Sequence, residues 1–435
     1  MGESGEAEVP LAGELRAVSA ATPAKFHGLL RDATQLSIGQ GFRLVIQAAY
    51  FVFIARSLGP DAYGAFVTVV AMAALLGPFS GLGTPNLFIK NVRAGRREPN
   101  LCWGNGIVLT VVSGSALSAV GLGLSLLLQL KTASFVVVMV CISDLVLLKV
   151  TELAAFGFTA LGRMKQTAIQ SVVICLLRLA GIVVLMLTVH PVTLRGWVVV
   201  YLFTSLLGMI YAVVKGGQIW GRPTTDLPAL RQDVAEGVFF SVAGSAATVY
   251  NDIDKIMLSR LADLAATGVY AAAYRVIDVT MTPVRALAAA AYPQFFREGA
   301  GGLGATYPYA LSLIAKAAIY GCLASAGLWL LAPGLPIVLG PKYVEVVGAV
   351  RWLALIPLLR CIHSFLADAL SGAGLQRTRT GVQVAVAAVN ILLNLMVLPR
   401  YSWRGAAWTS LGCDGLLVAA FLLIVLYYRR PWPRE

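Results

Sequence analysis

The residues in this sequence best suited to chemistry are charged side chains in the middle of long apolar runs. Arg178 and Arg360 lie near the centres of two such runs, Asp144 lies in a third, and Asp278 and Arg285 flank the centre of a fourth. A charge at the centre of a bilayer costs about 2.5 to 3.5 kcal/mol on insertion scales, so such side chains should face a protein interior or pair with one another. We therefore predict a polar interior within a membrane protein.

Two kinds of chemistry fit these residues. The planar guanidinium of arginine grips phosphate oxygens in pairs, and cations that line a low-dielectric cavity concentrate its field. The candidates for lining a substrate cavity are Arg43, Arg178, Lys255, Arg275, Arg285 and Arg360. Intramembrane carboxylates can couple proton or sodium flow to transport, or simply neutralise a neighbouring cation. The candidates for either role are Asp144, Asp252, Asp254, Asp278 and Asp368.

Helical spacing groups some of these side chains. At about 100° per residue, Arg275, Asp278 and Arg285 fall on one face of a helix. By the same spacing Asp252 and Lys255 share a face of the preceding helix, while Asp254 points nearly the opposite way. The first group can bind an anionic substrate, or Asp278 can hold helices together by neutralising one of the arginines, and both readings stay open.

The elements that position these residues must be membrane helices, because the chain is too apolar for a soluble protein. Of its 435 residues 58% are hydrophobic and only 13% are charged, and the mean hydropathy is +0.78; soluble domains carry about a quarter charged residues. Runs of roughly 20 apolar residues can each cross a bilayer. Such runs occupy residues 36–55, 64–88, 103–130, 133–154, 167–189, 192–214, 237–258, 267–296, 309–331, 346–370, 382–398 and 405–428. We predict an all-α polytopic membrane protein with twelve transmembrane helices.

The spans divide into two lobes of six helices. The predicted units are a cytoplasmic N-terminal tail (1–35), an N-lobe with helices 1 to 6 (36–214), a cytoplasmic connector (215–236), a C-lobe with helices 7 to 12 (237–428) and a cytoplasmic C-terminal tail (429–435). The formal net charge is +13, and most Lys and Arg outside the spans fall in segments that are cytoplasmic if both termini are inside. Membrane orientation, and not nucleic-acid binding, accounts for most of the positive charge.

Other classes of chemistry find little support. The six cysteines are scattered without CxxC spacing, which favours neither a disulfide framework nor a zinc site. The sequence has no GxxxxGK phosphate-binding loop, and we expect no metal and no cofactor. With only three histidines and no loop long enough for a soluble domain, a membrane-embedded glycosyltransferase or polymerase is the less favoured reading.

An internal repeat relates the two lobes. Arg56 and Gly64 close the first span as Arg260 and Gly268 close the seventh, and a second pair of arginines keeps the same offset of 204 residues. An even number of spans separates the copies, so both halves insert with the same orientation, as a parallel repeat around a cleft. Glycines and prolines between residues 77 and 85 predict a bend in the second helix, and prolines predict another in the eighth.

Three stretches of the sequence resemble a known family. Residues 54–64 (IARSLGPDAYG) form a turn between the first two helices, Asp254-Lys255 precedes residues 268–275 (GVYAAAYR), and residues 390–401 (NILLNLMVLPRY) precede a Gly-Ala-Ala triplet. These motifs resemble those of the bacterial polysaccharide or O-antigen flippases, within the multidrug, oligosaccharidyl-lipid and polysaccharide exporter superfamily. Ser402 departs from the pattern, which usually has glycine there.

The resemblance implies two six-helix lobes around a central lumen. It implies a flippase that moves a polyprenyl-diphosphate-linked oligosaccharide across the bacterial inner membrane by alternating access, for O-antigen, lipopolysaccharide or exopolysaccharide synthesis. Its partners would be that lipid-linked substrate, membrane lipids and a polysaccharide polymerase, with H⁺ or Na⁺ as an open question. The alternatives are a multidrug exporter of the same superfamily, which would favour acidic pocket residues, and a peptidoglycan-precursor flippase, which typically has two extra helices.

Overall fold

The computed structural model describes residues 23–428, apart from the side chains of residues 23–40 and of eight residues between 239 and 250. Residues 1–22 of the predicted N-terminal tail and the predicted C-terminal tail, residues 429–435, lie outside the described residues. The rest of the N-terminal tail, residues 23–35, is the beginning of the first helix.

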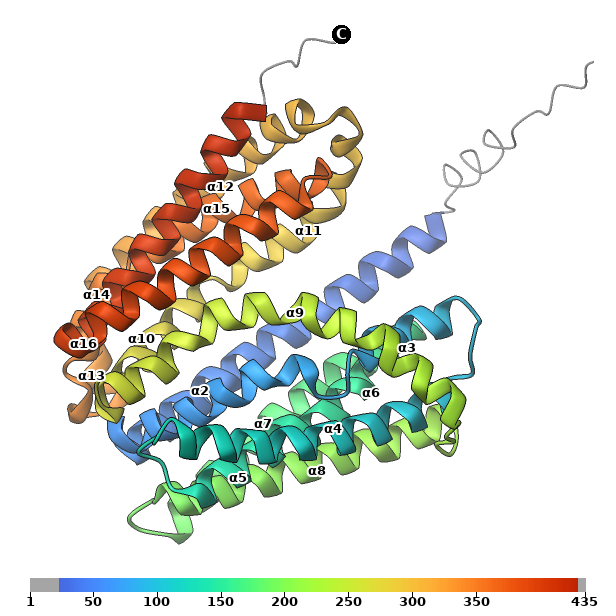
Figure 1. Ribbon diagram of the computed structural model, residues 1–435, viewed down its shortest axis with the longest axis horizontal. Helices are drawn as coiled ribbons and strands as arrows, with labels where there is room; N and C mark the ends of the chain where they lie inside the picture. Colours follow the sequence, from blue (N-terminus) through green and yellow to red (C-terminus); the bar gives the residue numbers. More distant parts are fainter. Residues whose placement is uncertain (1–22, 429–435) are drawn as a thin grey trace, which may run out of the picture.

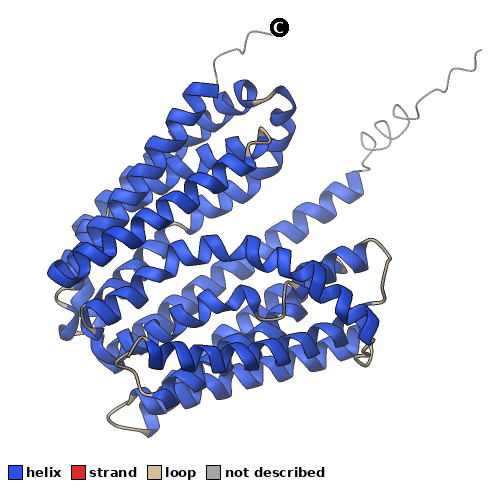
Figure 2. Cartoon of the chain, in the orientation of Figure 1, coloured by secondary structure: helices blue, strands red, loops and turns tan. Residues whose placement is uncertain are grey.

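Throughout the described chain the secondary structure is helical and the helices are joined by short loops (Figure 2). The all-α prediction is therefore confirmed. The helices are α2 (Pro23–Leu76), α3 (Thr84–Arg93), α4 (Pro99–Leu127), α5 (Ser134–Ile142), α6 (Leu148–Ala160), α7 (Met164–Thr188), α8 (Leu194–Trp220), α9 (Leu227–Leu261), α10 (Leu264–Thr280), α11 (Thr282–Glu298), α12 (Leu303–Leu331), α13 (Leu335–Leu339), α14 (Val346–Leu353), α15 (Ile356–Gly372) and α16 (Gln376–Tyr428).

Eight helical segments of the described chain are long and apolar enough to cross a membrane. Two of them, Gly41–Arg93 and Gln376–Tyr428, have 53 residues each, enough for two crossings of about 20 residues. The predicted spans at 237–258 and 267–296 form α9, α10 and α11 and are not among the eight; α10 and α11 have only 17 residues each because the helix breaks at Met281. A polytopic membrane protein is thus supported, and the number twelve stays a prediction.

The bends occur where glycine and proline were expected to place them. Helix α2 kinks at Gly59, which has a φ of 74°, and after Leu76 the chain passes through a short 3-10 turn and a loop before α3 begins. The break between α10 and α11 falls at Met281, just before Pro283. These breaks allow the two ends of one span to pack against different neighbours.

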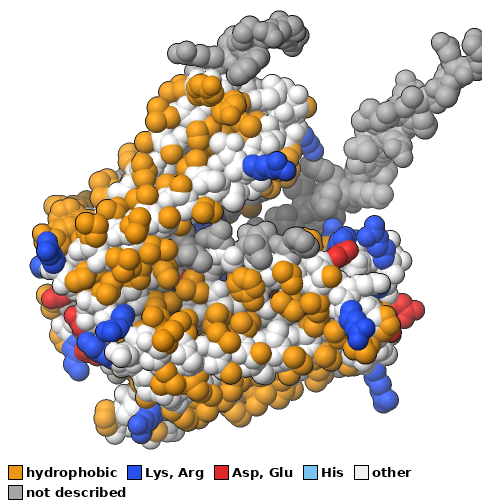
Figure 3. All heavy atoms as spheres, viewed as in Figure 1, with side chains coloured by type: hydrophobic (Ala, Val, Ile, Leu, Met, Phe, Trp, Pro, Cys, Tyr) orange, Lys and Arg blue, Asp and Glu red, His pale blue; other side chains and the backbone are white. Residues whose placement is uncertain are grey.

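The helices form two bundles that meet at one end and separate toward the other (Figure 1). Helices α2 to α8 make the first bundle, α10 to α16 make the second, and α9 runs between them. The largest hydrophobic core contains residues of both, among them Ile54, Trp197 and Tyr270, whereas the other clusters lie within one bundle each. Apolar side chains cover much of the visible face of both bundles (Figure 3), as a lipid environment requires.

The segment 215–236, predicted as a connector, is largely helical. Helix α8 continues to Trp220, and α9 already begins at Leu227. The early start has a local cause, because the Asp226 carboxylate accepts a hydrogen bond from the Ala229 N–H at 3.0 Å and so caps α9. Only the short stretch 221–226 between the two helices is irregular.

The first turns of α9 are tied to the first bundle by two ion pairs. Arg97 contacts Asp233 at 2.6 Å, and Lys90 contacts Glu236 at 2.8 Å. Burial raises the pKa of Asp233, although the Arg97 guanidinium opposes the shift. The Lys90 ammonium instead lowers the pKa of the exposed Glu236. Helix α9 therefore starts on one bundle and ends beside the other.

Candidate functional site

A pocket of about 190 Å³ lies between the two bundles, lined by α2, α7 and α8 from the first and by α9 and α10. Five of the predicted site residues reach it. They are Arg178, Asp252, Lys255, Arg275 and Asp278. Chain segments up to 100 residues apart in sequence thus bring cations and carboxylates to one place, among mostly apolar and aromatic side chains.

Arg178 on α7 reaches the pocket with much of its hydrogen-bonding capacity unused. Its Nη2 lies 3.9 Å from Asp144 Oδ1, an ion-pair distance that is too long for a hydrogen bond. Its guanidinium lies 4.3 Å from the centre of the Tyr201 ring, and the Tyr201 hydroxyl donates to Asp144 at 2.7 Å. Among the described residues the buried Nε and Nη2 have no hydrogen-bond partner. Buried donors are normally satisfied, so these two are available to an acceptor from outside the described chain.

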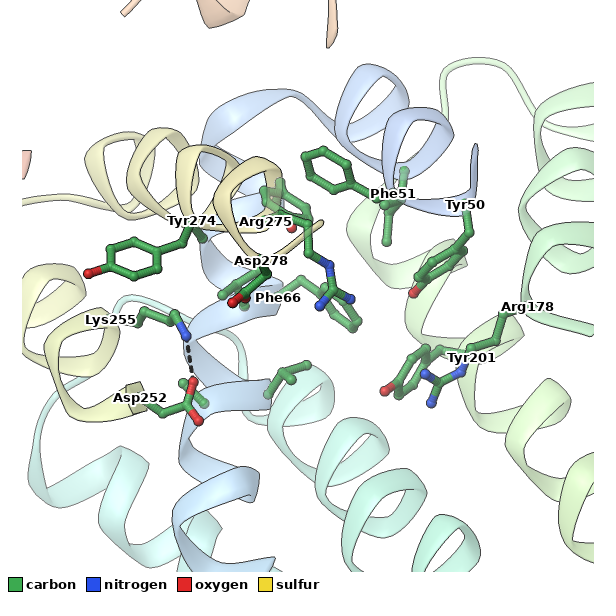
Figure 4. A pocket seen from close by; sticks show the side chains of 16 residues that line it. Tyr50, Phe51, Phe66, Arg178, Tyr201, Asp252, Lys255, Tyr274, Arg275 and Asp278 are labelled. Atoms are coloured by element: carbon green, nitrogen blue, oxygen red, sulfur yellow. Dashed lines mark hydrogen bonds and ion pairs between the residues drawn. The ribbon is translucent and has the colours of Figure 1, made fainter. Parts of the chain in front are cut away.

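Arg275 on α10 faces the same pocket from the other bundle. Figure 4 shows the guanidinium groups of Arg178 and Arg275 extending into the pocket from opposite sides. In the described part of the chain, half-buried Arg275 makes no hydrogen bond and no ion pair. Two guanidinium groups with unused donors therefore converge, one from each bundle.

The two carboxylates of the pocket are held by cations. Asp252 forms an ion pair with Lys255, one turn further along α9, drawn as a dashed line in Figure 4. Asp278 Oδ1 accepts a hydrogen bond from Arg285 Nη2 at 2.7 Å and lies 4.0 Å from Arg360 Nη1. Arg285 and Arg360 thus sit behind Asp278 and do not line the pocket themselves.

A chain of charged contacts continues from the pocket into the second bundle. Arg360 Nε lies 3.3 Å from Asp414 Oδ2, and His363 Nε2 lies 3.5 Å from Asp414 Oδ1. The Asp414 side chain is only 1% exposed. Asp278 at the pocket is therefore connected through Arg360 on α15 to a deeply buried carboxylate on α16.

Four further residues predicted from the sequence lie away from the pocket surface. Asp144 stands behind Arg178, as described above. Arg43 on α2 is half-buried. It lies near enough to the Cys175 thiol to interact with it electrostatically, as do Arg178 and Arg275. Asp254 points away from Asp252, as the helical spacing predicts, and accepts a hydrogen bond from the Tyr270 hydroxyl. Asp368 on α15 pairs with Arg379 at 3.3 Å.

The sequence reasoning missed the aromatic part of the site. Tyr50, Tyr63 and Phe66 from α2, Tyr201 from α8 and Tyr274 from α10 all line the pocket. In a membrane span such residues look like ordinary apolar side chains, which is why composition and periodicity did not single them out. The signal available was that Tyr63 and Tyr274 belong to two of the motifs quoted above.

This arrangement is suited to binding. Guanidinium groups donate hydrogen bonds to phosphate or carboxylate oxygens. The electron-rich faces of aromatic rings attract the C–H bonds of a sugar ring, and tyrosine hydroxyls can bond to its hydroxyl groups. In the described residues no group of three or more His, Cys, Asp or Glu side chains is placed to hold a metal ion. The pocket therefore combines cationic groups suited to an anion with aromatic rings suited to a sugar ring.

Comparison with known families gives one match. Residues 29–298 match the model of a family described as "Polysaccharide biosynthesis protein". No curated protein sequence matches the chain.

Several solved structures have the same fold. The lipid II flippase MurJ in an inward closed conformation has a TM-score of 0.74 at 12% sequence identity, covering 90% of this chain and 87% of that one. An inward-facing multidrug resistance MATE family transporter of the MOP superfamily has a TM-score of 0.69 at 13% identity, covering 89% and 96%. A MOP superfamily transporter from Pyrococcus furiosus has a TM-score of 0.62 at 16% identity, covering 92% and 94%. At such identities the similarity establishes the fold alone.

Proposed function

The chain belongs to the polysaccharide biosynthesis protein family and has the fold of MOP superfamily transporters, and from this premise we propose that it is a flippase for a lipid-linked oligosaccharide. Its substrate would be a sugar chain on a polyprenyl diphosphate, carried across the bacterial inner membrane for surface polysaccharide synthesis. Among the structural neighbours, MurJ is described as a flippase for lipid II.

The observation that carries the proposal is the pair of arginines with unused donors. Arg178 and Arg275 reach one pocket from opposite bundles, and buried Arg178 donors lack a partner in the described chain. A diphosphate presents several acceptor oxygens to such groups, and arginine binds them in parallel pairs. One anionic group held by both bundles would link substrate binding to their relative position.

The aromatic residues support the sugar part of the substrate. Tyr50, Tyr63 and Tyr274 line the pocket, and tyrosine rings are well suited to contact a sugar ring. The polyprenyl chain is apolar and belongs in the bilayer, so only the headgroup has to enter the pocket. Membrane lipids and the lipid-linked substrate are thus the proposed partners, together with a polymerase that uses the product.

Transport by alternating access follows from the repeat. Two lobes of parallel orientation can rock about a central site so that it faces each side in turn. The Lys and Arg distribution supports a multi-pass protein with both termini in the cytoplasm. With that orientation, the end at which the bundles separate faces the cytoplasm, where the lipid-linked sugar is made.

Ion coupling is part of the proposal. The route from Asp278 through Arg360 to buried Asp414 places carboxylates where binding of H⁺ or Na⁺ would rearrange contacts at the pocket. Transport into vesicles with and without an imposed proton or sodium gradient tests this. Equal rates under all gradients would reject coupling to either ion.

A second candidate is a multidrug exporter of the same superfamily. It is favoured by the two carboxylates in the pocket, Asp252 and Asp278, which would suit a cationic drug. Both already hold a cation of the chain, whereas the unused groups are cationic. The balance of charge therefore favours an anionic substrate over a drug cation.

Purified protein in liposomes decides between the two. A fluorescent polyprenyl-diphosphate oligosaccharide should move between leaflets in wild-type vesicles, and Arg178→Gln or Arg275→Gln should abolish the movement. Arg379→Gln is the matched control, because Arg379 pairs with Asp368 away from the pocket. Movement of cationic dyes together with indifference to lipid-linked sugar would identify an exporter instead.

A further inference from the structure

A second hollow lies on the first bundle. It is a groove of about 690 Å³ lined by residues of α5, α7 and α8. Figure 1 shows α5 and α8 on the side of the first bundle that faces away from the second. The groove shares no lining residue with the pocket between the bundles. It is therefore a separate site, and its volume falls within the range of about 300 to 1,000 Å³ that is common for small-ligand sites.

Apolar side chains form most of the groove wall. They come from Phe135 on α5, Leu185 on α7, and Val199 and Val200 on α8. The apolar surface continues beyond the groove, because Phe203 stands one turn after Val199 on the same face of α8 and is 58% exposed. Exposed apolar side chains on membrane-spanning helices meet lipid. The groove thus opens toward the chains of the bilayer.

Arg195, in the first turn of α8, is the charged residue of the groove. It is exposed, and its side chain makes no hydrogen bond and no ion pair with the described residues. The loops that precede α5 and α8, residues 128–133 and 189–193, contain no Asp or Glu. No carboxylate of these loops can therefore neutralise the guanidinium, which stays available to an anion from outside the chain.

The second lobe repeats this motif in a different environment. Arg195-Gly196 stands at the start of the last predicted span of the first lobe, and Arg404-Gly405 stands at the start of that of the second. A Cβ atom on Gly405 would overlap a neighbouring side chain at 2.7 Å, whereas one on Gly196 would meet nothing closer than 3.4 Å. The Arg404 guanidinium lies 5.2 Å from the centre of the Trp403 ring. The space beside Gly405 is thus occupied, and Arg404 already has an aromatic partner.

The position of Arg195 along its span defines the layer of the membrane that it meets. The predicted span begins at residue 192, and the Lys and Arg bias places this end on the outer side of the membrane. A guanidinium at that level lies among the phosphate groups of the outer leaflet, while the apolar groove beside it lies among their chains. One ligand that joins a phosphate to a hydrocarbon chain would fill both parts.

We propose that the groove is a binding site for an anionic phospholipid of the outer leaflet, such as phosphatidylglycerol. Its phosphate contacts Arg195, and one acyl chain lies along the apolar wall. A single guanidinium matches the single negative charge of a phosphodiester. A diphosphate carries more charge and is better served by two arginines, as in the pocket between the bundles. The site goes beyond the flippase function and does not depend on it.

Lipid binding to the purified protein in detergent tests the site. Native mass spectrometry should show that wild type retains phosphatidylglycerol in preference to phosphatidylethanolamine, whose headgroup has no net charge. Arg195→Gln should weaken the binding of phosphatidylglycerol about fivefold, because one arginine at an anionic membrane surface contributes about that factor. The same lipid should raise the unfolding temperature of wild type more than that of Arg195→Gln, because a ligand of the folded state stabilises it.

The matched control is Arg404→Gln, which removes the same charge from the equivalent position of the second lobe and should leave binding unchanged. Arg195→Lys keeps a cation at the groove and should retain most of the binding. Gly196→Leu keeps Arg195 but fills the groove, since a Cβ atom there already meets the Leu185 side chain at 3.6 Å, and it should weaken binding too. Equal losses in Arg195→Gln and Arg404→Gln would overturn the proposal, as would wild-type binding by both Arg195→Gln and Gly196→Leu.

A polyprenyl diphosphate is the second probe, because it is the other lipid that joins phosphate to a long chain. Weaker binding than that of phosphatidylglycerol, or binding that Arg195→Gln does not change, supports the phospholipid. Tighter binding that Arg195→Gln removes would overturn the assignment and make the groove a second site for the transport substrate. Absence of flipping in liposomes would reject the flippase function alone, because binding in detergent is measured without transport.

Discussion

The two halves of the pocket are built on related turns but treat their charges differently. In the first bundle, Arg178 stands 3.9 Å from Asp144 and keeps buried donors without a partner in the described chain. In the second bundle, the carboxylates and cations are tied together, with Asp278 contacting both Arg285 and Arg360. The first half of the pocket thus has hydrogen-bond donors without partners, whereas most charged groups of the second half are paired with one another.

This difference separates two uses of an intramembrane charge. A buried ion pair mainly compensates its own desolvation, and breaking it is costly. A buried cation without a full set of partners is costly as it stands, and a protein retains it where a ligand completes it. In the second bundle half-buried Arg275 lines the same pocket and makes no hydrogen bond or ion pair with the described residues. We therefore assign binding to the two convergent arginines and internal organisation or ion coupling to the paired groups.

The largest effect is expected for Arg178→Gln. Two charge-assisted hydrogen bonds to the substrate contribute about 1.5 to 3 kcal/mol each, so their loss should lower transport about a hundredfold or more. Thermal stability should fall less than when a closely paired charge is lost, because the contact of Arg178 with Asp144 is long at 3.9 Å and Asp144 keeps the hydrogen bond from Tyr201. Flipping assays and thermal unfolding of the same preparation measure both quantities. A large loss of stability with normal transport would reverse the assignment of Arg178.

The next effect compares the buried acids of the two halves. Asp414→Asn removes the charge of a carboxylate that is only 1% exposed and that contacts both Arg360 and His363, and should lower the free energy of unfolding by about 3 kcal/mol. Asp144→Asn keeps a hydrogen-bonding group opposite Tyr201 and should cost about 1 kcal/mol. Unfolding of the detergent-solubilised proteins gives the two values, and equal losses would erase the contrast between the bundles.

The sequence predicted the helices and most of the charged residues of the site, but not which of these charges pair with one another. Apolar length, glycine and proline established the helices and bends, because these depend on local preferences. Depth in the membrane and helical spacing identified Arg178 and Arg275. Spacing along one helix cannot tell which cation meets a carboxylate from another helix, so Arg360 with Asp414 and Asp278 remained hidden. The aromatic lining was missed for a similar reason, because an apolar environment conceals a ring that faces a cavity.

A smaller effect is expected for Arg285→Gln. Arg285 is 58% exposed, so water screens its contact with Asp278, and Arg360 stays nearby to share that carboxylate. Transport should fall only a few-fold, compared with the loss expected for Arg178→Gln. The two variants measured side by side in liposomes test whether exposure and pairing distinguish the cations. A loss as large as that of Arg178→Gln would place Arg285 among the substrate contacts.

The smallest expected effect is on the pH dependence of stability. It compares a buried and an exposed carboxylate on the same helix, α9. Asp233 and Glu236 both tie α9 to the first bundle, but burial raises the pKa of Asp233 and Lys90 lowers that of Glu236. A carboxyl whose pKa is raised in the folded state binds its proton more tightly there than in the unfolded chain, so its contribution to stability grows as the pH falls through that pKa. The contribution of Glu236 should instead fade as the pH falls through its lowered pKa, and it should be slight because Glu236 is exposed. Thermal unfolding of wild type, Asp233→Asn and Glu236→Gln from pH 7 to pH 4 measures both contributions. As the pH falls, wild type should gain stability relative to Asp233→Asn and should lose a little stability relative to Glu236→Gln. Shifts of the same sign would mean that burial does not set the charge state of Asp233.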